Sequence, residues 1–371
     1  MKVGIPSEVK NNEFRVAITP AGVHELVRHG HEVYVQQGAG LGSSITDAEY
    51  VAAGGAILPT ADEVWAIADL LLKVKEPIEE EYHRLRKDQT LFTYLHLAAS
   101  RPCTDALIAS GTTAIAYETV ETADRRLPLL APMSEVAGRL APQVGAYHLM
   151  RAAGGRGVLP GGVPGVAAGK AVVIGGGVSG WNATQIAVGM GFHVTLLDRD
   201  INKLKEADKV FGTKVQTVVS NSFELERACL EADLVIGAVL IPGAKAPKLV
   251  TNELVSRMKP GSVLVDIAID QGGCFEDSHP TTHAEPTFQV HNSVFYCVAN
   301  MPGAVPNTST HALTNATLPY ILELADRGWA EALRRDAALA KGVNTHDGKV
   351  VYREVAEAHG LEHTELSALL G

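Results

Sequence analysis

Residues 170–191 read KAVVIGGGVSGWNATQIAVGMG, an apolar run followed by a glycine turn and a helix-period segment. The turn places Gly175, Gly177 and Gly180 in GxGxxG spacing, directly after a predicted strand and at the start of a predicted helix. The first glycine permits a tight turn, the second lets the backbone approach a pyrophosphate, and the third lets helix and strand pack closely. The stretch therefore predicts a Rossmann unit that binds a dinucleotide at the helix N-terminus.

The spacing alone is a weak signal, because a chain with 36 glycines produces it by chance and a flexible turn is the alternative. Its context is more specific, since the next apolar run, HVTLLD at 193–198, ends in Asp198. A carboxylate about 20 residues after the glycines accepts hydrogen bonds from the adenosine ribose and repels a 2′-phosphate, which favours NAD. Arg199 keeps NADP open as an alternative, because a neighbouring cation can accommodate the extra phosphate.

Apolar runs alternate with helix-period segments on both sides of this stretch, which is the pattern of an α/β protein. The later runs are almost continuously apolar, as in parallel sheets covered on both faces. We expect two Rossmann-like, doubly wound parallel-sheet domains with a cleft between them. The predicted strands are residues 2–6, 31–36, 69–75, 90–96 and 112–118 in the first domain, and 171–176, 193–198, 215–220, 233–239 and 262–269 in the second.

A chain of 371 residues exceeds the size at which one hydrophobic core keeps growing, so two domains are expected. We assign residues 1–128 and 307–371 to a discontinuous substrate domain and 129–306 to the NAD-binding domain. Linking helices are expected near 134–150, with Ser134 as N-cap and Pro142 ending, kinking or dividing the helix, and near 307–325. Thr19 as N-cap and Pro20 in the first turn predict a further helix that ends at Gly30.

The composition excludes several classes of partner. Acidic residues outnumber basic ones by 42 to 32, and no Lys/Arg run forms a stripe suited to nucleic acid. The N-terminal segment lacks the apolar core of a signal peptide, and no apolar stretch reaches the roughly 18 residues of a membrane span, so we expect a cytoplasmic protein without a membrane partner. The four cysteines form no CxxC pair and are expected to be reduced thiols, and no convincing metal-ligand set is present.

Polar residues that end apolar runs are the candidates for chemistry, because ligands of open parallel sheets lie beyond the carboxyl ends of the strands. Lys75, His96 and Asp270 end such runs, and Arg15 lies in the polar loop after the first strand. Each has a plainer alternative. Lys75 could be solvated together with Lys73 on the same strand face, His96 could be a structural or surface histidine, Asp270 could only make a turn, and Arg15 could pair with Glu13 or Glu8.

Taken together, these residue types suit the oxidation of an amino acid. The reaction needs a cation for the carboxylate, a base for the ammonium proton, and a nicotinamide over the α-carbon. Arginine binds carboxylates in a bidentate way, and histidine is the usual acid/base near neutral pH.

The chain resembles the alanine dehydrogenases over essentially its whole length. Long segments carry the resemblance: MKVGIPSEVKNNEFRVAITPAGV, DLLLKVKEP, FTYLHLAAS, PLLAPMSEVAGRLAPQVGA, VVIGGGVSG, DLVIGAVLIPGAKAPKLV, VLVDIAIDQGGCFE and FYCVANMPGAVPNTST. The resemblance implies oxidative deamination of L-alanine to pyruvate and ammonia with reduction of NAD, the reverse reductive amination, and a homohexamer.

The resemblance also implies roles for individual residues. Arg15 and Lys75 would bind the carboxylate or carbonyl end of the substrate, His96 would be the acid/base, and Asp270 would assist proton transfer and position water. Tyr94 and Met133 would line the methyl pocket. Beside the glycines, the expected NAD contacts are Ser134, Val178, Ser179, Asp198, Lys203, Ser220, Val239, Leu240, Ile267, Asp270, Asn300 and Met301.

Two alternative functions stay open from the sequence. The NAD-binding component of proton-translocating transhydrogenases resembles this family, and such a chain would pass hydride to a membrane partner; the cluster of Arg15, Lys75 and His96 argues instead for a substrate pocket. A dehydrogenase of another amino or imino acid, such as the saccharopine group, is the other alternative.

Overall fold

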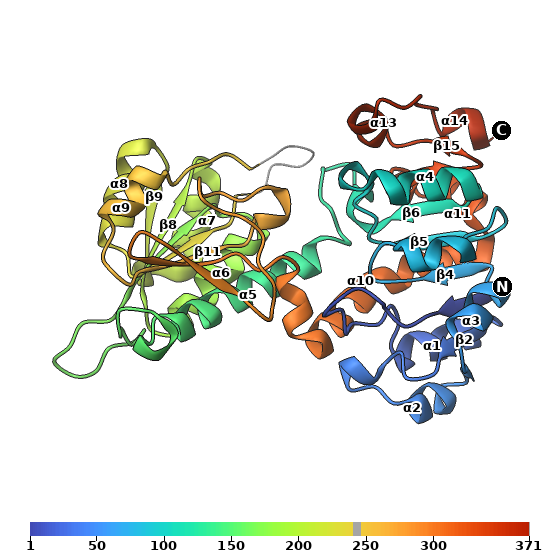
Figure 1. The fold of residues 1–371 in the computed structure, drawn as a ribbon, viewed down its shortest axis with the longest axis horizontal. Helices are drawn as coiled ribbons and strands as arrows, with labels where there is room; N and C mark the ends of the chain where they lie inside the picture. Colours follow the sequence, from blue (N-terminus) through green and yellow to red (C-terminus); the bar gives the residue numbers. More distant parts are fainter. Residues whose placement is uncertain (240–245, 371) are drawn as a thin grey trace. The chain divides into compact units, whose positions relative to one another are not determined.

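The computed structural model describes residues 1–239 and 246–370. The chain divides into two compact units, one made of residues 1–133 and 305–371 and the other of residues 134–304 (Figure 1). Each unit is an α/β layer structure around one sheet, as the strand pattern predicted. All ten predicted strands are present, and most are shorter than the apolar runs that predicted them.

The first unit carries an eight-stranded sheet among its described residues, in the order β15-β14-β6-β5-β4-β1-β2-β3. The six strands from β1 to β6 pair in parallel, and the two C-terminal strands are added antiparallel at the β6 edge. Its elements are β1 (Lys2–Ile5), α1 (Pro20–Arg28), β2 (Glu32–Gln36), α2 (Asp47–Ala52), β3 (Ala56–Leu58), α3 (Ala61–Ile67), β4 (Leu70–Leu72), β5 (Thr90–Thr93), α4 (Arg101–Ser110), β6 (Thr113–Ala116), α10 (Pro306–Arg327), α11 (Trp329–Arg335), α12 (Ala337–Ala340), β14 (Val343–His346), β15 (Lys349–Val350), α13 (Arg353–His359) and α14 (Ser367–Leu370).

The second unit carries a seven-stranded sheet among its described residues, in the order β12-β13-β11-β10-β7-β8-β9. Only its β12–β13 pair is antiparallel. Its elements are α5 (Ala131–His148), whose first turn belongs to the first unit, β7 (Lys170–Ile174), α6 (Val178–Gly189), β8 (His193–Asp198), α7 (Ile201–Phe211), β9 (Val215–Val219), α8 (Ser222–Glu231), β10 (Leu234–Gly237), α9 (Asn252–Arg257), β11 (Val263–Asp266), β12 (Thr287–Val290) and β13 (Ser293–Tyr296).

The central strands of the second sheet are buried on both faces. Successive residues of β7 point to opposite sides, so Val173 packs in one hydrophobic cluster and Val172 in the other. The same alternation holds for Ile236 and Val235 on β10. This double burial explains why the strand sequences are almost continuously apolar.

Helix boundaries follow the capping signals in the sequence, with one exception. Thr19 caps α1 by accepting the Gly22 N–H at 3.4 Å, as predicted. The prediction that Ser134 caps the linking helix is wrong, because α5 begins at Ala131. The chain already turns at Leu127, whose carbonyl accepts the Ala131 N–H, and Pro132 then falls in the first turn, where its missing N–H has no intrahelical partner to lose.

Pro142 neither ends nor divides α5, contrary to the expectation that it could. Gly138 explains how the helix is held: an added Cβ would lie 2.2 Å from the Ser179 carbonyl oxygen, so the backbones of α5 and α6 are in direct contact. At Gly145, an added Cβ would lie 2.5 Å from Leu234 of β10. We infer that this close packing offsets the cost of about 3 kcal/mol that an interior proline imposes.

Replacement of Gly180 by alanine tests the close approach of α6 to the glycine turn. An added Cβ would lie 1.7 Å from the Gly175 carbonyl oxygen, so we expect Gly180→Ala to destabilise the protein by about 3 kcal/mol or more in urea unfolding. Gly189 on the same helix is the matched control, because nothing lies within 4 Å of an added Cβ there. Gly189→Ala should be neutral or stabilising by up to about 1 kcal/mol, and equal effects of the two changes would contradict the packing argument.

Candidate functional site

Four of the predicted site residues lie at one edge of the first sheet. Arg15 follows β1, Lys75 follows β4, and Tyr94 and His96 follow β5. These three strands are adjacent and parallel, so their carboxyl ends meet at the same edge. The strand order reverses between β1 and β4, and ligands of such sheets bind at this switch point.

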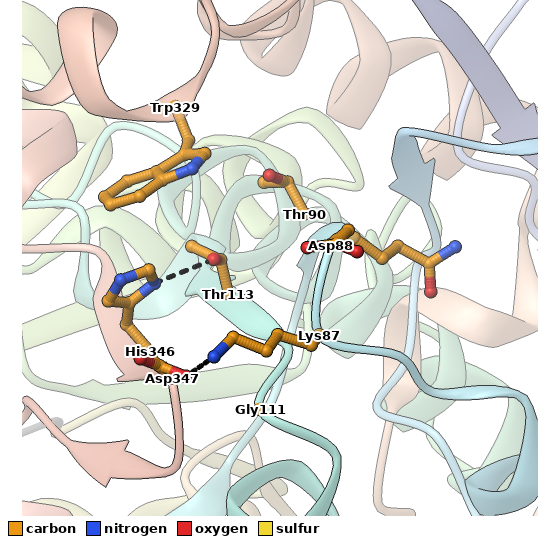
Figure 2. Close-up of a pocket in the computed structure, with 9 residues that line it drawn as sticks. Lys87, Asp88, Thr90, Gly111, Thr113, Trp329, His346 and Asp347 are labelled. Carbon is orange, nitrogen blue, oxygen red and sulfur yellow. Dashed lines mark hydrogen bonds and ion pairs between the residues drawn. The ribbon is translucent and has the colours of Figure 1, made fainter.

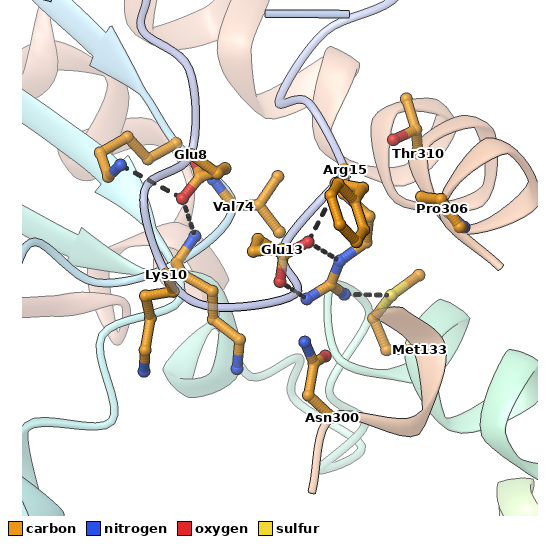
Figure 3. Close-up of polar contacts among 12 residues, drawn as sticks. Glu8, Lys10, Glu13, Arg15, Val74, Met133, Asn300, Pro306 and Thr310 are labelled. Atoms are coloured by element: carbon orange, nitrogen blue, oxygen red, sulfur yellow. Dashed lines mark hydrogen bonds and ion pairs between the residues drawn. The ribbon is translucent and has the colours of Figure 1, made fainter. Parts of the chain in front are cut away.

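Arg15 is buried and held by Glu13 (Figure 3). Its Nε and Nη2 donate to the two Glu13 carboxylate oxygens at 2.7 and 2.6 Å, and Nη1 lies 3.1 Å from the Met133 sulfur. Burial alone would lower the pKa of Arg15, but the hydrogen bonds and charge of Glu13 outweigh burial and raise it. The pairing of Arg15 with Glu13, which the sequence left open, is therefore present. It fixes the plane of the guanidinium beside Met133, a residue predicted to line the methyl pocket.

Lys73 and Lys75 have different surroundings. The alternative that both could be solvated is wrong for Lys73, whose side chain is fully buried between Glu8 and Glu81 at 3.2 and 2.9 Å. Lys75 is partly buried, and its charge helps to lower the pKa of Glu13 against the effect of burial. Lys75 therefore lies close to the carboxylate that holds Arg15.

His96 has an exposed ring on a left-handed backbone, with φ 48°. Its N–H and that of Leu95 donate to the Glu118 carboxylate at 2.6 and 3.1 Å, and His96 Nδ1 lies 3.8 Å from Glu118 Oε1. The ring stacks parallel to that of Tyr94, with centroids 5.9 Å apart. Burial raises the pKa of Tyr94, so its hydroxyl stays neutral and donates to the Leu129 carbonyl at 2.6 Å.

Glu118 is a functional candidate that the sequence analysis missed. It ends the predicted strand 112–118, the same kind of position that selected Lys75 and His96. A search for every charged residue at a strand end would have found it.

In the second unit, the glycine turn has the geometry that a dinucleotide requires. Gly175 has φ 100°, nothing lies within 4 Å of an added Cβ at Gly177, and Gly180 lies against the turn itself. Gly177 is the residue that precedes α6, so the free N–H groups of the first helical turn lie beside an open backbone. The turn follows β7 at the point where the strand order reverses toward β10, and it therefore fits a pyrophosphate.

Asp198 ends β8 and is linked to the glycine turn. Its carboxylate accepts the Gly176 N–H at 2.6 Å and the Asp200 N–H at 2.8 Å, and Lys203 Nζ lies 3.5 Å away. A carboxylate has about four acceptor positions, so these contacts leave capacity for a ribose hydroxyl. Ser220 is joined to the same place, because its N–H donates to the Asp198 carbonyl.

The other expected cofactor contacts also follow carboxyl ends of parallel strands or lie in the first turns of helices. Val239 follows β10, Ile267 and Asp270 follow β11, and Asn300 and Met301 follow β13. Ser134 lies in the first turns of α5, and Val178 and Ser179 begin α6. Leu240 lies outside the described residues. The parallel strands therefore bring the sheet-end contacts to one edge of the second sheet.

Asp266 is a buried carboxylate that the sequence analysis did not select. It ends β11, accepts the N–H groups of Ala268, Cys274 and Phe275, and accepts the Ser278 hydroxyl at 2.5 Å. Burial raises its pKa. It organises the loop that carries Ile267 and Asp270.

A hollow of about 330 Å³ lies at the opposite edge of the first sheet (Figure 2). It is lined at the amino ends of β5 and β6 by Thr90 and Thr113, and by Trp329 and His346. None of the predicted site residues lines it, and its position before the strands is the wrong edge for the chemistry. In residues 1–239 and 246–370, we find no group of three or more His, Cys, Asp or Glu side chains placed to hold a metal, and no helix long and apolar enough to cross a membrane.

The buried Arg15–Glu13 pair predicts a measurable loss of stability. Glu13→Gln should lower the free energy of unfolding by about 3 kcal/mol, because it leaves a buried guanidinium without its carboxylate. Glu357→Gln, on an exposed face of α13, is the control and should change it by less than about 0.5 kcal/mol.

The same pair predicts how stability depends on pH. The folded-state pKa of Glu13 is lowered below its ordinary 4.5, so the contribution is complete above the unfolded-state value and is lost as pH falls through the lower folded value. The stabilities of wild type and Glu13→Gln should therefore begin to converge as pH falls below 4.5, and they should meet below the lowered folded-state pKa of Glu13. A constant difference at all pH values would show that the lost stability is not electrostatic.

Comparison with known proteins identifies the family. Family models described as "Alanine dehydrogenase/PNT, N-terminal domain" and "Alanine dehydrogenase/PNT, C-terminal domain" match residues 4–137 and 141–353. A curated relative, an alanine dehydrogenase of Mycolicibacterium smegmatis, is 68% identical over 370 residues and is covered completely, as is this chain.

Solved structures give the same result. An L-alanine dehydrogenase superposes with a TM-score of 0.95 at 51% identity, covering 97% of this chain and 99% of that one. A transhydrogenase from Sinorhizobium meliloti superposes with a TM-score of 0.83 at 27% identity, covering 95% and 100%. The fold, the glycine turn and the full-length similarity lead to one conclusion: the chain belongs to the alanine dehydrogenase family, whose members use a nicotinamide cofactor.

Proposed function

We propose that the protein oxidises L-alanine to pyruvate and ammonia with NAD, and that it catalyses the reverse reductive amination. Eight curated relatives bear the name alanine dehydrogenase at 54–68% identity, and they support this activity over the more distant transhydrogenase. The observation that carries the proposal is the cluster of Arg15, Lys75 and His96 at the switch point of the first sheet.

Arg15 and Lys75 bind the carboxylate of the amino acid in this proposal. The two hydrogen bonds that Arg15 donates to Glu13 fix the orientation of the guanidinium plane, which suits bidentate recognition of a second carboxylate. Lys75 supplies a further positive charge close by. Tyr94 and Met133, which contact His96 and Arg15 respectively, bound the space for a small side chain.

His96 accepts the proton of the substrate ammonium group and returns a proton to nitrogen when ammonia leaves. Its exposed ring is reachable, while the backbone bonds to Glu118 and the Tyr94 ring hold its orientation. Asp270, also exposed, assists the addition of water to the imine carbon. A nicotinamide bound at the second unit would supply the acceptor for the hydride of the α-carbon.

In this proposal the pyrophosphate is held by the glycine turn and the start of α6, at Gly175, Gly177, Val178, Ser179 and Gly180. The adenosine ribose is held by Asp198 with Lys203. Asp198 favours NAD because a 2′-phosphate would lie against a carboxylate. The remaining residues expected to contact the cofactor are Ser134, Ser220, Val239, Leu240, Ile267, Asp270, Asn300 and Met301. We further propose, on the family resemblance, that the protein is a cytoplasmic homohexamer.

An activity assay tests the proposed reaction directly. Purified protein with L-alanine and NAD should produce NADH, measured by its absorbance, with a lower rate for NADP and for larger amino acids. A hydride relay would give no signal without a second protein, and a preference for a longer amino acid would favour the saccharopine-like alternative. Either result would overturn the proposal.

Replacement of His96 by alanine tests the acid/base assignment. We expect turnover with L-alanine to fall by at least about a hundredfold, because a positioned acid/base contributes about 10²–10⁴-fold. His24→Ala on the exposed side of α1 is the matched control and should keep wild-type turnover. Normal turnover of His96→Ala would eliminate the histidine as the acid/base.

A further inference from the structure

One buried carboxylate connects the two loops that carry Arg15 and Lys75. Glu8 lies in the loop after β1, beside Val74 (Figure 3). Its carboxylate contacts three successive residues after β4. Glu8 Oε1 accepts the Val74 N–H at 2.6 Å. Glu8 Oε2 accepts the Lys75 N–H at 3.3 Å and the Lys73 ammonium at 3.2 Å.

The contact between Glu8 and the loop after β4 is buried and charged, which makes it strong. The Glu8 side chain is 2% exposed and that of Lys73 is 0% exposed. Hydrogen bonds to a charged group in such an environment are stronger than neutral ones, and the two loops cannot slide past each other without breaking them. A second ion pair, between Lys10 and Glu76, joins the same two loops at a more exposed place.

The loop after β1 contains both Glu8 and the Glu13–Arg15 pair. Glu8 also accepts the backbone N–H of Lys75 itself and that of Val74 before it. The distance between the two cations that bind the substrate carboxylate in the proposed function is therefore set through Glu8.

We propose that Glu8 is a positioning residue for substrate recognition: it holds the Lys75 backbone to the Arg15 loop and so fixes the spacing of the two substrate-binding cations. The inference rests on the proposed function, because it assumes that Arg15 and Lys75 bind the substrate. It assigns Glu8 no direct contact with the substrate.

Glu81 provides the matched control. It pairs with the same Lys73 at 2.9 Å and is equally buried, with a side chain 2% exposed. The Glu81 carboxylate also accepts the Ile78 N–H at 3.2 Å, whereas the N–H groups of Val74 and Lys75 donate to Glu8. Glu8→Gln and Glu81→Gln therefore each remove one carboxylate partner of Lys73. Only Glu8→Gln also changes the group that accepts the Lys75 N–H.

The test measures steady-state kinetics and thermal unfolding of the full-length enzyme. Glu8→Gln places an amide NH₂ where Oε2 accepts two donors. The KM for L-alanine and for pyruvate should therefore rise about tenfold to a hundredfold, which is the effect of misplacing a substrate-binding group by about 1 Å. The KM for the cofactor should stay within about twofold of wild type. Glu81→Gln should lower the melting temperature as Glu8→Gln does, but leave the KM for alanine unchanged.

Glu8→Asp is the second variant, in case Glu8→Gln does not fold. It keeps the charge beside Lys73 but shortens the reach to the backbone, so it should retain most of the stability and still raise the KM for alanine. Equal KM changes in Glu8→Gln and Glu81→Gln, or no change in either Glu8 variant, would overturn the proposal. Lys75→Ala in the same assay separates failure of the positioning role from failure of the proposed function. If Lys75→Ala raises the KM for alanine while both Glu8 variants do not, only the positioning role of Glu8 fails. If the wild-type enzyme does not oxidise alanine, the proposed function fails.

Discussion

Parallel pairing of strands is the constraint on which the rest of this structure depends. In a parallel sheet every strand ends at the same edge, so residues far apart in the chain meet there without any local sequence signal. The first sheet brings Arg15, Lys75 and His96 to its carboxyl edge in this way, and the second brings the glycine turn and Asp198 to its own. The reversal of strand order beside β1 and beside β7 then leaves room at that edge for a ligand.

Buried or half-buried carboxylates hold the loops at these edges. In the first unit, Glu8 accepts N–H groups of the loop that carries Lys75, Glu13 accepts those of Arg15, and Glu118 accepts those of Leu95 and His96. In the second unit, Asp198 accepts an N–H of the glycine turn and Asp266 accepts those of the loop after β11. Loops that lack secondary structure leave backbone N–H groups that must find acceptors when buried. A carboxylate satisfies several at once, and its charge makes each bond stronger than a neutral one. The candidate functional side chains therefore lie on loops whose backbone N–H groups bind buried or half-buried carboxylates.

The sequence predicted the strands well because their signal is local. Residues 171–174 are apolar on both faces, and the structure buries both. The glycines were also predictable, since Gly180 lies so close to Gly175 that no side chain fits. The predictions that failed concerned contacts with distant residues: α5 begins before Ser134 and passes through Pro142 because of its packing against α6 and β10, and Lys73 is buried because Glu8 and Glu81 come to it from other parts of the chain.

By itself, the sequence determined the two α/β sheets, the glycine turn and the residue types suited to amino-acid oxidation, because apolar periodicity, glycine conformation and side-chain chemistry are properties of short segments. Only the tertiary structure decided which charges are paired and which loops are joined. Glu8 and Lys75 are 67 residues apart in the chain, and Glu118 and His96 are 22 apart. Such pairs are selected by the free energy of burying a charge with a partner, which depends on the whole sheet and not on any one stretch of sequence.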